Sequence, residues 1–196
     1  MAKPKERSGN SHGIALSDDF STPAFGTRWS FYKPRFGEHL RARLEKNSLV
    51  LSGGGTSPTD SAVLTGLTGD HAYEVTVEVE TASFAQGGLL LFYSNRLYCG
   101  MGHNGSRLST YRSGLLSFWP EPGAPSLRRI YMRIVNDHHI VTMYYSANGS
   151  NWTRHGLRME TSGYNTNTIG DLLSLRPPCM RLARATWRFA ISSIGR

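Results

Sequence analysis

Three glutamates at alternating positions are the residues of this chain whose spacing best suits acid–base chemistry. Glu74, Glu78 and Glu80 point to one side of an extended run, and valines occupy the opposite side. Alternate residues on a strand lie about 6.6–6.8 Å apart at Cα. Glycosidases hold their two carboxyl groups about 5–5.5 Å apart when retaining and about 6.5–9.5 Å apart when inverting. Glu78 and Glu80 could therefore serve as the carboxylate pair of a glycosidase built on one strand.

The same row of glutamates has a simpler interpretation. Some β-sandwich glycosidases carry Glu-x-Asp-x-(x-)Glu along one strand, but Val79 stands where the central aspartate would be and points to the other face. Glutamates opposite valines also describe a half-buried strand with one solvated face. The sequence has no Gly-x-Ser-x-Gly, no phosphate-binding Gly-x-x-x-x-Gly-Lys and no His-Glu-x-x-His. We expect no catalytic residue here and keep the autonomous glycosidase as an alternative.

Metal binding has one candidate pair. Asp18 and Asp19 could contribute carboxylate oxygens to a Ca²⁺ ion, and they could equally cap a turn. His138 and His139 are adjacent in a predicted turn, so they point to opposite sides of an extended chain and make a poor metal pair. We expect no other cofactor.

Aromatic side chains offer a different chemistry, the binding of sugars. A sugar ring stacks on a flat aromatic face while its hydroxyls bond to a few polar groups. Tyr98 shares its strand face with Gly100 and Gly102, which predicts an open ring; for each aromatic, packing in the core remains the alternative. The predicted carbohydrate-binding residues are Tyr93, Tyr98, Tyr111, Arg112 and Trp119.

Strands must position all of these side chains. Strict alternation over Tyr73–Glu80 predicts a half-buried antiparallel strand, and an Asn104-Gly105 turn between two extended runs predicts a hairpin. Other strands are predicted at Arg28–Tyr32, Leu40–Leu44, Ser48–Leu51, Ala62–Leu67, Gly88–Tyr93, Leu97–Met101, Leu108–Tyr111, Leu115–Trp119, Arg129–Val135, His139–Ser146, Trp152–His155, Leu172–Leu175 and Ala185–Ile191. Many short strands without a convincing helix predict an all-β fold of two packed antiparallel sheets.

Length and composition fit one domain. The chain has 196 residues, which suits a single domain. We expect a linker or tail over residues 1–15 and a β-sandwich over residues 16–196. No stretch approaches the roughly 18 apolar residues of a membrane span, and the polar start lacks the apolar region of a signal peptide. We therefore expect no membrane contact, and a cytoplasmic location if the chain is complete.

Neither the net charge nor the two cysteines indicate a specific function. The net charge of +8 comes from arginines spread along the chain rather than from one stripe or tail, which argues against nucleic-acid binding. Cys99 lies in an apolar strand and is expected to be a buried thiol, while its pairing with Cys179 stays open.

Several segments between about Ile14 and Ile191 resemble one family, in the same order along the chain. They are Leu16–Ser21, Trp29–Tyr32, Gly55–Ser61, Ala72–Val75, Gly88–Tyr93, Arg96–Gly100, Arg133–His139, Tyr144–Ser146, Ser162–Asn165 and Leu173–Pro177. These segments resemble the C-terminal concanavalin-A-like β-sandwich (jelly roll) of glycoside hydrolase family 43, of the β-xylosidase and α-arabinofuranosidase type. Lys3–Arg7 resembles the linker that follows the catalytic propeller of such enzymes.

The resemblance implies an accessory domain. In that family the catalytic carboxylates belong to a five-bladed propeller, in cis or in trans, and the sandwich narrows its pocket with a loop. The matching loop is Ser162–Asp171, with Tyr164, Asn165 and Ile169 as its pocket-capping residues, although an aromatic found there in many relatives is missing.

Three functions follow from these observations. The first is a non-catalytic module that recognises xylan or xylo-oligosaccharides, components of hemicellulose, by aromatic stacking. The second is a structural domain that packs on and completes a β-xylosidase propeller without sugar affinity of its own. The third is the autonomous glycosidase built on Glu78 and Glu80.

Overall fold

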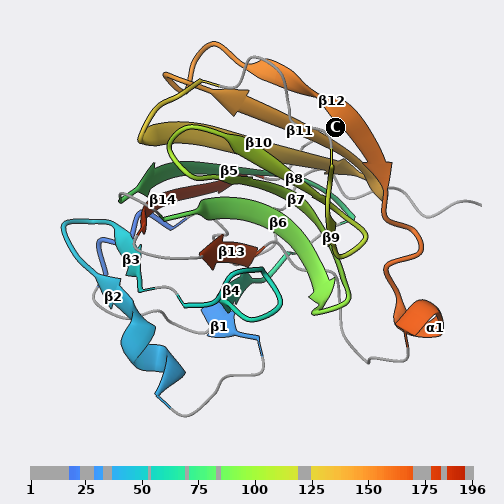
Figure 1. Cartoon of the computed structure of the whole chain (residues 1–196), viewed down its shortest axis with the longest axis horizontal. Helices are drawn as coiled ribbons and strands as arrows, with labels where there is room; N and C mark the ends of the chain where they lie inside the picture. The colour runs from blue at the N-terminus through green and yellow to red at the C-terminus, as the bar shows by residue number, and fades with distance from the viewer. Residues whose placement is uncertain are drawn as a thin grey trace, which may run out of the picture.

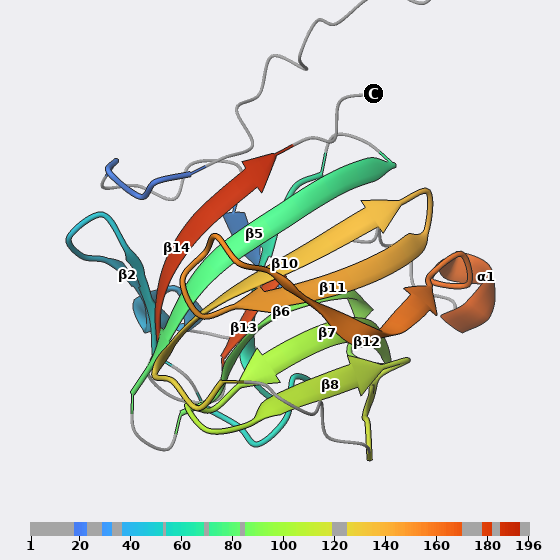
Figure 2. The same cartoon turned by 90° about the horizontal axis from the view of Figure 1, so that it is seen from above.

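Within the residues that the structure describes, the chain folds into two packed antiparallel sheets of seven strands each, which confirms the predicted all-β sandwich (Figures 1 and 2). The computed structural model describes residues 18–22, 29–32, 37–52, 54–68, 71–82, 85–118, 125–169, 178–181 and 185–192. In chain order the elements are β1 Trp29–Phe31, the 3₁₀-helix η1 Glu38–Arg41, β2 Ala42–Leu44, β3 Leu49–Leu51, β4 Ala62–Gly66, β5 Ala72–Thr81, β6 Gly87–Ser94, β7 Leu97–His103, β8 Leu108–Arg112, β9 Leu115–Leu116, β10 Arg129–Asp137, β11 Ile140–Ser146, β12 Thr153–Glu160, α1 Thr166–Ile169, β13 Pro178–Arg181 and β14 Ala185–Ser192.

The order of strands in each sheet mixes the two ends of the chain. One sheet runs β1-β4-β13-β6-β7-β8-β9 and the other runs β12-β11-β10-β5-β14-β3-β2. The last two strands therefore lie inside the sheets, with β13 between β4 and β6 and β14 between β5 and β3. Among the described strands, those at the edges of the sheets are β1, β9, β12 and β2.

The core lies between the sheets and follows the alternation of the sequence. Val75, Val77 and Val79 of β5 are fully buried, as are Ile130 and Met132 of the paired strand β10. Burying an aliphatic side chain of this size stabilises a fold by about 1.5–3 kcal/mol. The face of the β5–β10 pair that carries the glutamates is therefore the outer face.

The described residues contain two short helices that the sequence does not predict, and the first of them shifts a strand boundary. A strand was expected from Leu40, but η1 occupies Glu38–Arg41, so β2 begins at Ala42. The single-turn α1 follows β12. The expected strand Leu172–Leu175 lies outside the described residues, and the side chain of Cys179 is likewise not described. Cys99 is a free, buried thiol whose burial raises its pKa to about 12.

Within the described residues, no helix has the length and apolar character that crossing a membrane requires.

The hairpin between β10 and β11 turns on two histidines in the left-handed region. Asp137 pairs with Ile140, which leaves His138 and His139 as a two-residue loop with φ of 47° and 75°. Two-residue hairpin loops with both φ positive are type I′ turns, which favour Asn-Gly. A residue other than glycine in this region costs about 1–3 kcal/mol, although histidine tolerates it better than most.

Replacing these histidines by His138→Asn and His139→Gly should raise the free energy of unfolding by about 1 kcal/mol, because the strain of the turn is relieved. Urea unfolding of the double variant measures this change. The control pair His138→Ala and His139→Ala keeps a side chain at each positive φ and should give no gain. A gain of equal size in both variants would contradict the explanation.

Candidate functional site

The sheet that contains β6, β7 and β8 carries apolar residues on both of its faces. Leu89, Leu91 and Cys99 belong to the main core between the sheets. The alternate residues point the other way and form a second cluster, which we call the outer aromatic cluster. Its members are Val63, Leu90, Phe92, Tyr98 and Tyr111, with Tyr32 packed against them.

Tyr98 lies inside this cluster rather than on an open surface. Its ring is only 2% exposed; it stacks on Phe92 with centroids 5.8 Å apart and tilts against Tyr111 at 5.9 Å. Burial, with a smaller contribution from the nearby charge of Asp60, raises its pKa. The expectation of an open ring is therefore wrong, because aromatic neighbours on β6 and β8 enclose the ring that the glycines of β7 would have left free.

The other predicted sugar-binding residues are either buried, exposed or outside the described part of the chain. Tyr93 and Tyr111 are 2% and 4% exposed, so neither ring offers a face to a ligand. The hydroxyl of Tyr93 lies 3.2 Å from Thr166 Oγ1, and Tyr111 Oη accepts a hydrogen bond from Gln86 Nε2 at 3.1 Å. Burial raises the pKa of Tyr111 to about 12.

Arg112 is exposed at the end of β8, and Trp119 lies outside the described residues. The structure thus brings Tyr98 and Tyr111 together in the interior.

The predicted pocket-capping loop is fixed to the hairpin between β8 and β9. Tyr164 packs against the main core, and its hydroxyl accepts a hydrogen bond from Ser113 N at 3.1 Å and donates one to the carbonyl of Tyr98 at 3.4 Å. Burial raises the pKa of Tyr164 to about 12. Tyr164 therefore anchors the loop to the sheet. Accordingly, α1 lies on the same side of the sandwich as β9 (Figure 1).

Asn165 has a structural task in the same loop. Its Oδ1 accepts hydrogen bonds from the backbone N–H groups of Asn167 and Thr168 at 3.0 and 3.3 Å, and its Nδ2 donates to the carbonyl of Ser162 at 2.8 Å. This arrangement caps the first turn of α1. Ile169 ends α1, and its side chain is not described.

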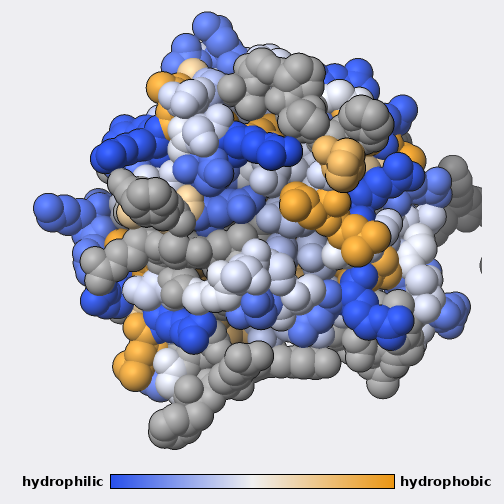
Figure 3. Space-filling model, in the orientation of Figure 1, coloured by the Kyte–Doolittle hydropathy of each residue, from blue (hydrophilic) through white to orange (hydrophobic). Residues whose placement is uncertain are grey.

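The strand β9 forms an apolar edge that the sequence did not single out as a site. Leu115 and Leu116 are 73% and 62% exposed, and Phe118 follows at 91%. Figure 3 shows apolar side chains gathered over the part of the surface where Figure 1 places β9. In the sequence, two adjacent leucines in a predicted strand were the one indication of this apolar edge. Only the strand order reveals that the strand lies at the edge of a sheet.

The row of glutamates on β5 is paired with arginines of β10. Glu78 and Glu80 both contact Arg129, at 3.2 and 3.1 Å, and Glu74 contacts Arg133 at 3.1 Å. The guanidinium of Arg133 also lies 3.9 Å above the ring of Trp152. These cross-strand pairs explain the spacing of the glutamates without any catalytic role.

Asp18 and Asp19 use their carboxylates to fix the local chain. Asp18 accepts hydrogen bonds from Phe20 N at 2.9 Å and from Trp29 Nε1 at 2.8 Å. Asp19 accepts from the backbone N–H and the hydroxyl of Ser21, and these bonds lower its pKa. Among the described residues, no group of three or more His, Cys, Asp or Glu side chains could hold a metal ion.

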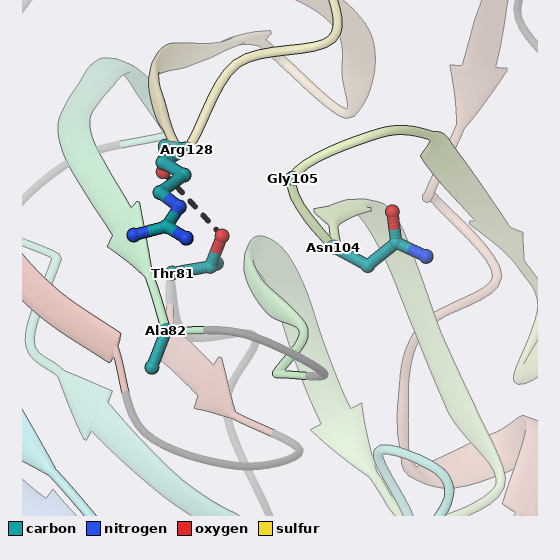
Figure 4. Close-up of a pocket in the computed structure, with 5 residues that line it drawn as sticks. All are labelled: Thr81, Ala82, Asn104, Gly105 and Arg128. Carbon is teal, nitrogen blue, oxygen red and sulfur yellow. Dashed lines mark hydrogen bonds between the residues drawn. The ribbon is translucent and has the colours of Figure 1, made fainter.

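A small pocket of about 170 Å³ opens between the end of β5, the turn from β7 to β8 and the segment before β10 (Figure 4). Its lining residues are Thr81, Ala82, Asn104, Gly105 and Arg128. Asn104 Oδ1 is already occupied by the N–H groups of Ser106 and Arg107, and its amide points away from Arg128. The pocket therefore has few groups that converge on a ligand.

The buried side chain of His103 holds two of the segments next to this pocket in place. Its Nδ1 accepts a hydrogen bond from Gly105 N, and its Nε2 lies 3.0 Å from the carbonyl of Pro125. These partners require the neutral ring with its proton on Nε2. Burial lowers the pKa of His103, against a smaller opposing effect of the bond to Pro125.

A family model described as the β-xylosidase C-terminal concanavalin A-like domain of glycoside hydrolase family 43 matches residues 17–171. The chain belongs to this family. Comparison with curated proteins found no match.

Solved structures that resemble this family 43 sandwich share its fold at low sequence identity. A variant of the GH43 protein BlXynB from Bacillus licheniformis is 17% identical with a TM-score of 0.72, covering 94% of this chain and 40% of its own. The GH43B protein of a Bacteroides ovatus xyloglucan locus is 15% identical with a TM-score of 0.73, covering 97% and 42%. The xylan β-1,4-xylosidase of Bacillus halodurans C-125 is 14% identical with a TM-score of 0.71, covering 95% and 42%. The sandwich thus spans about two-fifths of the length of these relatives.

The burial of Tyr98 predicts a large effect on stability. Tyr98→Ala should lower the free energy of unfolding by about 3–5 kcal/mol, because it leaves a cavity in the outer aromatic cluster. Tyr98→Phe keeps the ring and should cost less than about 1.5 kcal/mol. Denaturant unfolding measures both, and Arg112→Ala serves as an exposed control with an expected change within about 0.5 kcal/mol. Equal stability of Tyr98→Ala and the wild type would contradict the buried position.

The neutral state of His103 predicts a stability that depends on pH. Below the ordinary histidine pKa of 6.5 the unfolded chain takes up a proton that the folded ring does not, so stability falls as pH decreases towards the lowered pKa. The slope contributed by one histidine is at most about 1.4 kcal/mol per pH unit. Unfolding of the wild type and His103→Gln between pH 7 and pH 5 should therefore show a steeper loss in the wild type. Parallel curves would refute the assignment.

Proposed function

We propose that this chain is a non-catalytic accessory sandwich of a family 43 hydrolase, and that it packs on and completes a catalytic propeller. The observation that carries the proposal is the interior position of Tyr93, Tyr98 and Tyr111, at 2%, 2% and 4% exposure. A stacking site needs open aromatic faces. A role in packing on another domain needs none.

Membership of the family and the length of the relatives support a partner domain. The three solved chains named above are more than twice as long as the matched sandwich, since the match covers 40% or 42% of each. We propose that the partner domain is a β-xylosidase or α-arabinofuranosidase propeller, in cis or in trans. The parent hydrolase would act on xylan or xylo-oligosaccharides; xylan is the substrate that the name of the Bacillus halodurans relative gives for that protein.

Independent recognition of xylan by this sandwich is the weaker proposal. Of its five predicted residues, Arg112 is the one whose side chain the structure describes as exposed, and a single arginine does not make a sugar platform. The autonomous glycosidase is weaker again, because the ion pairs to Arg129 occupy Glu78 and Glu80.

Affinity gel electrophoresis of the chain through xylan, cellulose and laminarin tests the proposal. We expect no retardation in any gel, because the three tyrosines are enclosed. Retardation by xylan that disappears in Arg112→Ala or Trp119→Ala would support the binding module instead. Release of sugar by the isolated chain that is lost in Glu78→Gln would support the glycosidase.

A further inference from the structure

We propose that the β9 edge, formed by Leu115 and Leu116, is the surface on which the catalytic domain docks. The inference rests on the proposed function, since it names the contact through which an accessory sandwich would act. The two leucines are 73% and 62% exposed although they are neighbours on a strand, whose side chains point to opposite faces. The strand is therefore exposed on both faces as well as along its open edge.

Comparison of the four sheet edges sets β9 apart. Isolated proteins protect edge strands with charges or by covering them, because unpaired strand edges promote association. The edge strand β12 exposes Arg154, Arg158 and Glu160, and β2 exposes Arg43, which pairs with Glu45 at 3.2 Å. The fourth edge strand, β1, buries Trp29 and exposes Ser30 between its neighbours. The strand β9 carries neither a charge nor a cover over its leucines.

The hairpin that presents this edge is held rigidly. Gly114 N donates a hydrogen bond to the carbonyl of Tyr98 at 2.9 Å, and Ser117 N donates to the carbonyl of Thr110 at 2.7 Å. Gly114 has φ of 80°, and a Cβ there would collide with the carbonyl of Arg96. The hydroxyl of Tyr164 adds the bond to Ser113. A surface that is already ordered loses little conformational freedom on binding, which favours docking.

Two arginines on the segments beside the edge indicate the chemistry of the partner. Arg96 and Arg112 are exposed, and neither guanidinium forms an ion pair within the part of the chain that the structure describes. Interfaces commonly surround an apolar centre with a polar rim. The partner surface should therefore present an apolar hollow for the leucines with carboxylates beside it.

A second copy of this chain fits the edge less well than a catalytic domain. A two-fold dimer places the same patch on both subunits, so Arg96 and Arg112 of one copy would approach those of the other. The strand β9 has two residues, which allows few backbone hydrogen bonds between edges. Family 43 relatives carry further chain beyond the sandwich, which supplies a different partner.

The test measures, by calorimetry, binding of this chain to the separately expressed catalytic propeller of the family 43 hydrolase that the proposed function assigns to it. We expect the double variant Leu115→Ser and Leu116→Ser to bind at least tenfold more weakly, because two apolar side chains lose their burial. Leu115→Met and Leu116→Met keep the apolar edge and should bind within threefold of the wild type. The matched control on the other edge, Arg154→Ser and Arg158→Ser, should leave the affinity unchanged. Thermal unfolding of each isolated variant confirms that the fold is intact.

The outcomes separate this inference from the proposed function. Equal affinity of the wild type and the serine variant overturns the β9 edge as docking surface and leaves the accessory function standing. A wild-type sandwich that neither binds the catalytic domain nor alters its activity overturns both. Analytical ultracentrifugation tests whether a second copy of this chain occupies the edge instead. A dimer of the isolated chain that the serine variant abolishes would assign the edge to a second copy and overturn the inference.

Discussion

Burial of β6 and β7 on both faces is the constraint on which the rest of the structure depends. One face supplies the main core, and the other supplies the outer aromatic cluster, so every residue of both strands is buried. Because neither face of these strands meets solvent, the aromatic side chains of this sheet stabilise the fold. Exposed apolar side chains lie at the margin of this sheet, on β9 beside β8.

The local patterns of the sequence predicted the strands well, and they failed where a property depends on distant segments. Alternation between Tyr73 and Glu80 defines a strand and its buried face because both follow from the period of two. The openness of Tyr98 was inferred from Gly100 and Gly102 alone. It is decided by Phe92 and Tyr111, which belong to other strands and close over the ring.

The same limit applies to the glutamates and to the capping loop. Glu78 and Glu80 meet an arginine about fifty residues later in the chain, and only the register of β5 against β10 brings them together. The hydrogen bonds of Tyr164 to Ser113 and to Tyr98 likewise join segments that are more than fifty residues apart in the chain. The edge position of Leu115 and Leu116 is likewise a property of the strand order, which no local pattern of residues encodes.

The placement of β13 and β14 has a consequence for how the chain reaches this state. In the native order, β13 lies between β4 and β6, and β14 lies between β3 and β5. Neither sheet can therefore be completed until its bridging strand has emerged from the ribosome. Contacts this distant in sequence make folding slow. A nascent chain that ended before Pro178 would lack the strands that join the two halves of each sheet, and unpaired strand edges of this kind make folding intermediates prone to aggregation.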